Sequence, residues 1–157
     1  MQIIRKQVAD QLGHFLPHAY RVGVKFLPAE HSVAKSRPKC DKKREHRIVM
    51  EIVVDAYDEI ERALGWYYYL DNQLQFPFEA ICITKRAISP LKAKDKVEVL
   101  GMPSEEECEH EMFVTIAWDD RDLAVPLSQL KPSRGTDEDT KQAVADWHYW
   151  VKMGYRF

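Results

Sequence analysis

Cysteine is scarce in this sequence, and the few copies lie far apart. Only Cys40, Cys82 and Cys108 occur in 157 residues, with no C-x-x-C pair among them. This odd number excludes a fully paired disulfide framework and predicts free thiols in a reducing compartment. The sequence also lacks an uncharged apolar run of about 18 residues, the length that a membrane span needs. Charged residues interrupt the first fifteen positions, so no signal peptide is predicted, and we expect a cytoplasmic protein with no membrane partner.

Signatures of the common enzyme classes are missing too. There is no G-x-G-x-x-G or G-x-x-x-x-G-K-[ST] loop for phosphates and no G-x-S-x-G nucleophile turn. The string H-E-M-F-V at His110 lacks the second histidine of a helical zinc pair. An EF-hand also fails, because loops counted from Asp120 or Asp137 lack the required glycine and the final glutamate. We therefore expect a protein that is not an enzyme and has no EF-hand.

The sequence does contain enough apolar residues for a core, and its charge is unevenly distributed. Hydrophobic residues make up 45% of the chain and aromatic residues 11%, which is typical of a packed domain. Residues 1–48 hold eleven Lys and Arg against four Asp and Glu, a net charge of +7. Residues 49–157 hold twelve against twenty-one, a net charge of −9. A basic head therefore precedes an acidic body, as in chains with an interaction arm or a poorly ordered leader.

The N-terminal part divides from the rest near residue 43. Apolar residues at helical spacing predict a helix over 3–16, and alternation predicts a strand over 20–26. Residues 31–47 hold almost no apolar residues and are typical of a solvated linker. We assign residues 1–43 to a basic N-terminal extension and linker, and residues 44–157 to the main domain.

Two or three helices are predicted in the main domain. Residues 48–57 are densely apolar and fit a helix, with a buried strand over 48–54 as the alternative. A capping box of Asp58 and Glu61 begins the next helix, in which Gly65 permits close approach of a neighbour. The closing helix is predicted to start at a capping box of Thr136 and Asp139, to bury the stripe Ala143, Trp147, Trp150 and Val151, and to end at Gly154.

Short strands with a period of two lie between these helices. They are predicted at 78–84, 96–101, 112–118 and 123–126, with the turn D-D-R-D joining the last two. Four short, closely spaced strands suggest a strongly bent sheet. The expected fold class is α+β, with a small SH3-like antiparallel β-barrel flanked by N-terminal and C-terminal helices.

Carboxylates gather in the loop M-P-S-E-E-E-C-E-H-E-M, which holds Glu105, Glu106, Glu107, Glu109 and Glu111. Ca²⁺ prefers about six to eight hard oxygen ligands, and carboxylates on a loop can supply several of them. The alternative is a solvated acidic loop that only joins two strands.

Two further acidic segments are candidates. The turn W-D-D-R-D contains Asp119, Asp120 and Asp122, although Asp is also common in turns because it tolerates a left-handed backbone. The segment D-A-Y-D-E-I-E places Asp55 and Glu59 on one helical face, and Asp71 follows; helix capping is the alternative explanation there. The metal ligands that we predict on these grounds are Asp55, Glu59, Asp71, Glu105, Glu107, Glu109, Asp119 and Asp120.

Other patterns are weaker. Cys108 and His110, with Cys82 near them, could hold zinc, but no fourth ligand is visible and Cys82 fits a strand core. The strings G-W-Y-Y-Y-L and D-W-H-Y-W could stack nucleic acid bases, but their acidic surroundings repel phosphates and favour core packing. We therefore do not expect a nucleic acid partner.

Several of these strings together resemble a known family. The segments V-D-A-Y-D-E-I-E-R-A-L-G-W-Y-Y-Y-L-D, V-E-V-L-G-M, E-E-C-E-H-E-M-F-V, A-V-P-L-S-Q-L and D-W-H-Y-W occur in order from about Arg44 to Phe157. They resemble the small bacterial calcium-binding proteins first recognised in cyanobacteria, which are not built on EF-hands. The resemblance implies Ca²⁺ binding through clustered carboxylates on a compact α+β body, with a role in buffering or signalling.

The main hypothesis is thus a non-enzymatic Ca²⁺-binding protein, a buffer or a sensor. The alternative is an SH3-like module that binds a protein or nucleic acid with help from its basic arm. A third reading is a structural zinc domain that uses Cys108 and His110. The sequence does not predict the oligomeric state.

Overall fold

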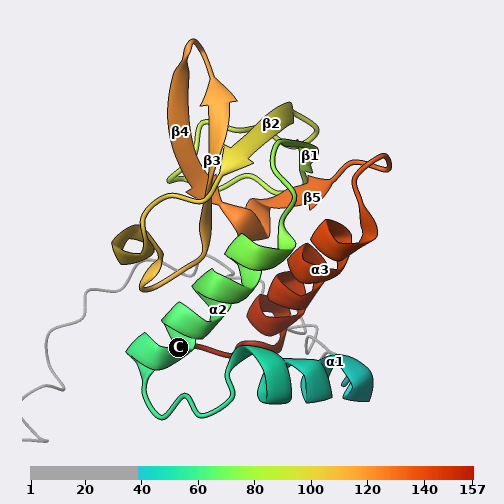
Figure 1. Ribbon diagram of the computed structural model, residues 1–157. Helices are drawn as coiled ribbons and strands as arrows, with labels where there is room; N and C mark the ends of the chain where they lie inside the picture. Colours follow the sequence, from blue (N-terminus) through green and yellow to red (C-terminus); the bar gives the residue numbers. More distant parts are fainter. Residues whose placement is uncertain (1–38) are drawn as a thin grey trace, which may run out of the picture. The chain divides into compact units, whose positions relative to one another are not determined.

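The acidic body folds around one antiparallel sheet and a pair of long helices, as the computed structural model shows for residues 39–157 (Figure 1). The helix expected over 3–16, the strand expected over 20–26 and the start of the linker lie outside these residues. The helices are α1 (Lys42–Arg47), α2 (Glu59–Gln73) and α3 (Glu138–Met153). The strands are β1 (Phe78–Cys82), β2 (Lys96–Gly101), β3 (Phe113–Trp118), β4 (Arg121–Pro126) and β5 (Leu130–Pro132). Within residues 39–157, no helix is long and apolar enough to span a bilayer.

The sheet is open rather than closed. Its strand order is β4-β3-β2-β1-β5, and all neighbouring strands are antiparallel. Among the described residues, strand β4 pairs only with β3 and the three-residue β5 pairs only with β1, so the two outer strands do not meet. The α+β class is confirmed, whereas the SH3-like closed barrel is not. The sequence also missed β5, because L-K-P is too short to show an alternating pattern.

Predicted strand positions are otherwise close to those observed. Strand β2 has the predicted bounds, while β1 ends two residues early and β3 starts one residue late. Strand β4 begins at Arg121, because Trp118 pairs with Arg121 across a two-residue turn of Asp119 and Asp120. Both turn residues have positive φ, 52° and 61°, as in the turn type whose twist matches a hairpin.

Tryptophans from α2 and α3 form the helical part of the core. Trp66 is fully buried, and its ring lies edge-on to Trp147 at 5.1 Å and to Trp150 at 5.5 Å. Aromatic pairs favour this edge-to-face geometry over a face-to-face sandwich. The interpretation of the two aromatic strings as core-packing residues therefore holds for these tryptophans. Val151, expected on the same buried stripe, is 42% exposed.

The helix ends show which capping signals were correct. Glu61 donates its backbone N–H to Asp58 at 2.8 Å, and the Glu61 carboxylate accepts from the backbone N–H of Tyr57, so the predicted start of α2 is confirmed. Helix α3 differs, because Asp137 is its N-cap and accepts from the backbone N–H of Thr140 at 2.8 Å. The predicted capping box of Thr136 and Asp139 was wrong, because the N-cap is one residue later than predicted. The ionised side chain of Asp137 makes a charge-assisted hydrogen bond to a backbone amide of the helix, which a threonine hydroxyl does not. Gly154 ends α3 with φ of 78°, as expected.

Part of the expected linker is helical. Asp41 accepts from the backbone N–H groups of Lys43 and Arg44, and α1 follows over Lys42–Arg47. The linker prediction was wrong for these six residues, because α1 is held by charged contacts to α3 and carries no apolar stripe. The domain boundary near residue 43 stays a prediction.

Candidate metal centre

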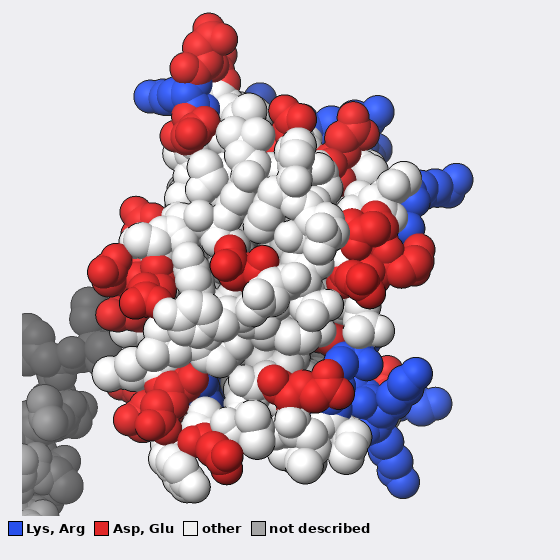
Figure 2. All heavy atoms as spheres, viewed as in Figure 1, with Lys and Arg blue, Asp and Glu red and all other residues white. Residues whose placement is uncertain are grey.

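The acidic loop forms a short 3-10 helix, η2 (Glu105–Cys108), whose last residue is buried in the domain. Cys108 is only 1% exposed, and its Sγ lies 3.9 Å from the carbonyl oxygen of Phe113. Glu105, Glu106 and Glu107 are exposed on the same turn. Figure 2 shows a group of acidic side chains over this part of the molecule, at the left of the view. The turn is thus fixed by a buried thiol and presents its carboxylates to solvent.

Two tyrosines connect η2 to helix α2. The hydroxyl of Tyr68 donates to Oε2 of Glu105 at 2.7 Å, and that of Tyr67 donates to the carbonyl oxygen of Pro103 at 2.9 Å. The hydrogen bond to Glu105 raises the pKa of Tyr68. The pKa of Tyr67 is raised first by burial and then by nearby charges, among them Asp71 and Glu105. Carboxylates from α2 and from η2 therefore act on the same pair of tyrosines.

Next to this contact is a small cavity with an apolar floor and an acidic rim. Its volume is about 150 Å³, and Ile60, Ala63 and Leu64 of α2 form the floor. Glu105, Glu106 and Glu109 form the rim. Three carboxylates of one loop are thus gathered over one face of α2.

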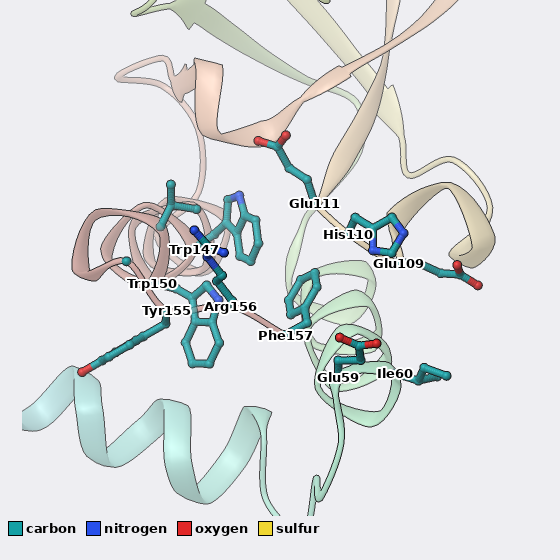
Figure 3. Close-up of a pocket in the computed structure, with 12 residues that line it drawn as sticks. Glu59, Ile60, Glu109, His110, Glu111, Trp147, Trp150, Tyr155, Arg156 and Phe157 are labelled. Carbon is teal, nitrogen blue, oxygen red and sulfur yellow. The ribbon is translucent and has the colours of Figure 1, made fainter. Parts of the chain in front are cut away.

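A larger cavity of about 640 Å³ adjoins the first, and Ile60 and Glu109 line both. Glu59, at the start of α2, lines the larger cavity together with His110 and the C-terminal residues of the chain. Figure 3 shows Glu109 and Glu111 pointing away from each other, with His110 between them. Glu59 is therefore the α2 carboxylate that shares a cavity with the η2 loop.

Glu111 belongs to a different interaction. It forms an ion pair with Arg86, and Oγ of Ser128 donates to its Oε1 at 2.9 Å. Glu111 is thus already neutralised by a cation of the chain, and its charge is directed away from the η2 rim.

The predicted ligands do not all lie together. Glu59 and Asp71 lie on α2, where they are about 18 Å apart along the helix axis and cannot share one ion. Glu105 and Glu107 lie on η2, and Glu109 follows it directly. Asp119 and Asp120 occupy the tip of the β3–β4 hairpin, far from α2 (Figure 1). Asp55 sits in the loop before α2 with φ of 57°.

The predicted ligand Glu107 is exposed beside Cys108. Burial raises the pKa of the Cys108 thiol, which disfavours the thiolate that a zinc site requires. Cys82 is buried in β1, as expected, with Sγ 3.3 Å from the carbonyl oxygen of Thr84.

Carboxylates that could bind Ca²⁺ are therefore close together, but they do not form a complete coordination shell. Across residues 39–157, no three His, Cys, Asp or Glu side chains are arranged so that they could hold a metal ion. The donor set, hard oxygens on an exposed turn, suits Ca²⁺ better than zinc.

Sequence reasoning left two residues out of the predicted site. Glu106 was noted in the acidic loop but not chosen as a ligand, and it lines the cavity beside Glu105. Tyr68 was placed with the core aromatics, yet it is 51% exposed and holds Glu105. The sequence did contain a signal for this exposure, because residues two positions apart lie on nearly opposite faces of a helix and Trp66 was expected in the core.

Comparison with known proteins identifies the family. Residues 46–151 match the model of the CcbP family, which is described as "Calcium binding". The crystal structure of Anabaena CcbP has a TM-score of 0.68 and 44% identity, over 76% of this chain and 98% of that one. A calcium-binding protein in the calcium-binding form has a TM-score of 0.67 and 45% identity, over 74% of this chain and 95% of that one. A search of curated proteins gave no match. As the sequence resemblance predicted, the chain belongs to the CcbP family of calcium-binding proteins.

Proposed function

We propose that this chain binds Ca²⁺ on the face formed by α2 and η2, through Glu105, Glu106 and Glu109 with Glu59 beside them. The observation that carries this proposal is the cavity over Ile60, Ala63 and Leu64, whose rim consists of two carboxylates of η2 and that of Glu109, which follows it. Membership of a calcium-binding family supports the choice of ion. The family is described as calcium binding, and we propose binding without catalysis.

The charge balance at η2 supports cation binding. Among the residues that the structure describes, neither Lys nor Arg forms an ion pair with Glu105, Glu106 or Glu109. A bound Ca²⁺ would supply the missing positive charge and offset the repulsion between these groups. Because the three side chains are exposed, they can rotate toward one ion without unpacking the core.

The alternatives named from the sequence have less support. The hairpin carboxylates Asp119 and Asp120 are accounted for by turn geometry, since both have positive φ. Asp71 lies beyond Tyr67 and Tyr68, and we assign it the role of a nearby charge that strengthens cation attraction. The open sheet gives no support to an SH3-like module.

The test compares two double variants of the full chain. Glu105→Gln with Glu109→Gln removes two charges from η2, and Asp119→Asn with Asp120→Asn removes two from the hairpin while keeping residues that tolerate positive φ. Ca²⁺ binding is followed by calorimetry and by thermal unfolding, with a chelator as the reference. At a Ca²⁺ concentration of about one hundred Kd, binding stabilises the fold by about 2.7 kcal/mol.

We expect the η2 variant to lose this stabilisation and the hairpin variant to keep it. Loss of binding in the hairpin variant alone would place the ion at Asp119 and Asp120 instead. Absence of any Ca²⁺ response in the unmodified chain would contradict the proposed function itself.

A further inference from the structure

A groove lies on another part of the domain, between α3, the β5–α3 connection and α1. Its volume is about 630 Å³, and it shares no residue with the cavities of the α2–η2 face. Val144, Ala145 and Tyr149 of α3 form its floor with Pro132. Lys141 and Lys152 line the same side of α3. We call this feature the basic groove.

Its charge is opposite to that of the domain as a whole. Arg44, Lys131, Arg134, Lys141 and Lys152 line the groove, and no Asp or Glu among residues 39–157 does. Four of the twelve Lys and Arg found in residues 49–157 are thus gathered here, although that region carries a net charge of −9. Figure 2 shows most basic side chains of this view along its right edge, where acidic side chains lie as well, and few at the left. In a region where acidic residues outnumber basic ones, a groove lined by several cations is not expected from a random distribution of charge.

Most of these cations are available to a ligand. Arg44 is paired with Asp146 at 2.8 Å, and Lys141 with Glu138 at 2.8 Å. Lys131, Arg134 and Lys152 form no ion pair with any residue from 39 to 157. Three uncompensated cations therefore surround an apolar floor, which attracts an anion with apolar parts.

The length of the groove suits an extended segment of peptide. Lys141 and Lys152 are eleven residues apart on α3, about 16 Å along the helix axis. About five residues of extended peptide span this distance, so one such segment can lie beside both lysines. Alternate side chains of an extended peptide point to opposite sides, so acidic residues can meet the cations while apolar residues meet the floor.

We propose that the basic groove binds an extended acidic peptide segment, with interspersed apolar residues, from a protein partner. Charge complementarity supplies the attraction and register, and the floor of Val144 and Ala145 supplies apolar contact. Nucleic acid fits less well, because both aromatic rings that the described residues give to the lining are already engaged. The hydroxyl of Tyr149 donates to Glu45 at 2.6 Å, and His148 is largely buried with its Nε2 3.3 Å from the carbonyl oxygen of Leu127.

The test uses the full chain and a labelled peptide of about ten residues that alternates Glu and Leu. Binding is measured by fluorescence anisotropy, and the binding surface is mapped by amide chemical shifts. The groove variant is Lys131→Gln, Arg134→Gln and Lys152→Gln. The matched control is Lys85→Gln, Lys92→Gln and Lys96→Gln, which removes the same charge from exposed lysines outside the groove.

We expect the groove variant to weaken peptide binding by about tenfold or more and the control by less than about twofold. The shifts should fall on residues 131–134 and 141–152. Equal weakening in both variants, shifts confined to other residues, or absence of binding by the unmodified chain would overturn the proposal. Tighter binding of single-stranded oligodeoxythymidine than of the peptide would assign the groove to nucleic acid and overturn it as well.

Discussion

Arg47 and Asp146, which are 99 residues apart in the sequence, form a bidentate ion pair inside the domain. Nε of Arg47 donates to Oδ2 at 2.7 Å, and Nη2 donates to Oδ1 at 2.7 Å. The Asp146 side chain is fully buried and also accepts from the hydroxyl of Tyr69 at 2.9 Å. Nε of Arg44 lies 2.8 Å from the same carboxylate. One buried carboxylate therefore connects α1, α2 and α3.

Removal of this carboxylate should be strongly destabilising. In Asp146→Ala the guanidinium of Arg47 and the hydroxyl of Tyr69 lose their acceptor inside the protein, and we expect the free energy of unfolding to fall by about 3–5 kcal/mol. Urea unfolding followed by circular dichroism measures this change. The control is Glu138→Gln, which removes the exposed partner of Lys141 and should cost no more than about 0.5 kcal/mol. Similar losses in the two variants would contradict the role given to Asp146.

This ion pair also shows where sequence reasoning failed. Residues 42–47 are almost entirely charged, and hydrophobic periodicity gives no signal for a helix that is held by an ion pair to a distant residue. The same limit applies to β5 and to closure of the sheet, because both depend on pairing between segments far apart in the chain. Helix α2, helix α3 and four of the strands were predictable, since local patterns of apolar residues, caps and turns specify them.

The candidate site was predictable to a similar extent. The density of Glu in residues 105–111 identified the acidic loop from composition alone, but not its 3-10 turn. Only the fold shows which other carboxylates share its surroundings: Glu59 lies at the same cavity as Glu109, whereas Asp119 and Asp120 are at a distant hairpin. Convergence of residues from separate elements is a tertiary property, and spacing along the chain does not contain it.

Calcium binding at η2 should lower the pKa of Tyr68. The hydrogen bond to Glu105 raises this pKa, because the negative carboxylate favours the protonated phenol. A cation bound at Glu105 offsets that effect. Titration of individual tyrosines by carbon NMR, with and without Ca²⁺, measures the shift.

Tyr155 provides the internal control for this titration. Its hydroxyl donates to Oε1 of Glu45 at 2.8 Å, and this hydrogen bond raises its pKa, but it contacts no carboxylate of η2. Its pKa should not respond to Ca²⁺. Equal shifts in Tyr68 and Tyr155 would indicate a general effect of the salt, and no shift in either would argue against an ion at Glu105.

His148 should make the fold less stable as the pH falls below about 6.5, the ordinary pKa of histidine. Burial lowers the pKa of His148, and its Nε2 lies 3.3 Å from the carbonyl oxygen of Leu127. Between the lowered pKa and the ordinary one, the unfolded chain takes up a proton that the folded chain does not, so stability decreases with falling pH in that window. Urea unfolding at a series of pH values measures the slope.

The matched variants for this slope are His148→Gln and His110→Gln. The first removes the buried imidazole and should flatten the dependence of stability on pH, whereas the second removes an exposed one and should leave it unchanged. Parallel pH profiles for the unmodified chain and His148→Gln would show that His148 does not contribute.

Gly65 should not tolerate a side chain, although alanine is the better helix former. The π-helical turn η1 (Ile48–Ile52) ends against α2, and a Cβ added at Gly65 would overlap the carbonyl oxygen of Ile52. That atom belongs to the backbone and cannot move aside by a change of rotamer. Ile48 and Ile52, both buried, would have to shift with it.

We therefore expect Gly65→Ala to lower the free energy of unfolding by about 1–3 kcal/mol, in spite of the gain of about 1 kcal/mol in helix propensity. Gly135→Ala is the control, because a Cβ there meets nothing within 4 Å; it should be neutral or slightly stabilising. Thermal unfolding measures the Tm of the two variants. An unchanged Tm for Gly65→Ala would show that η1 can move away from α2 without loss of packing.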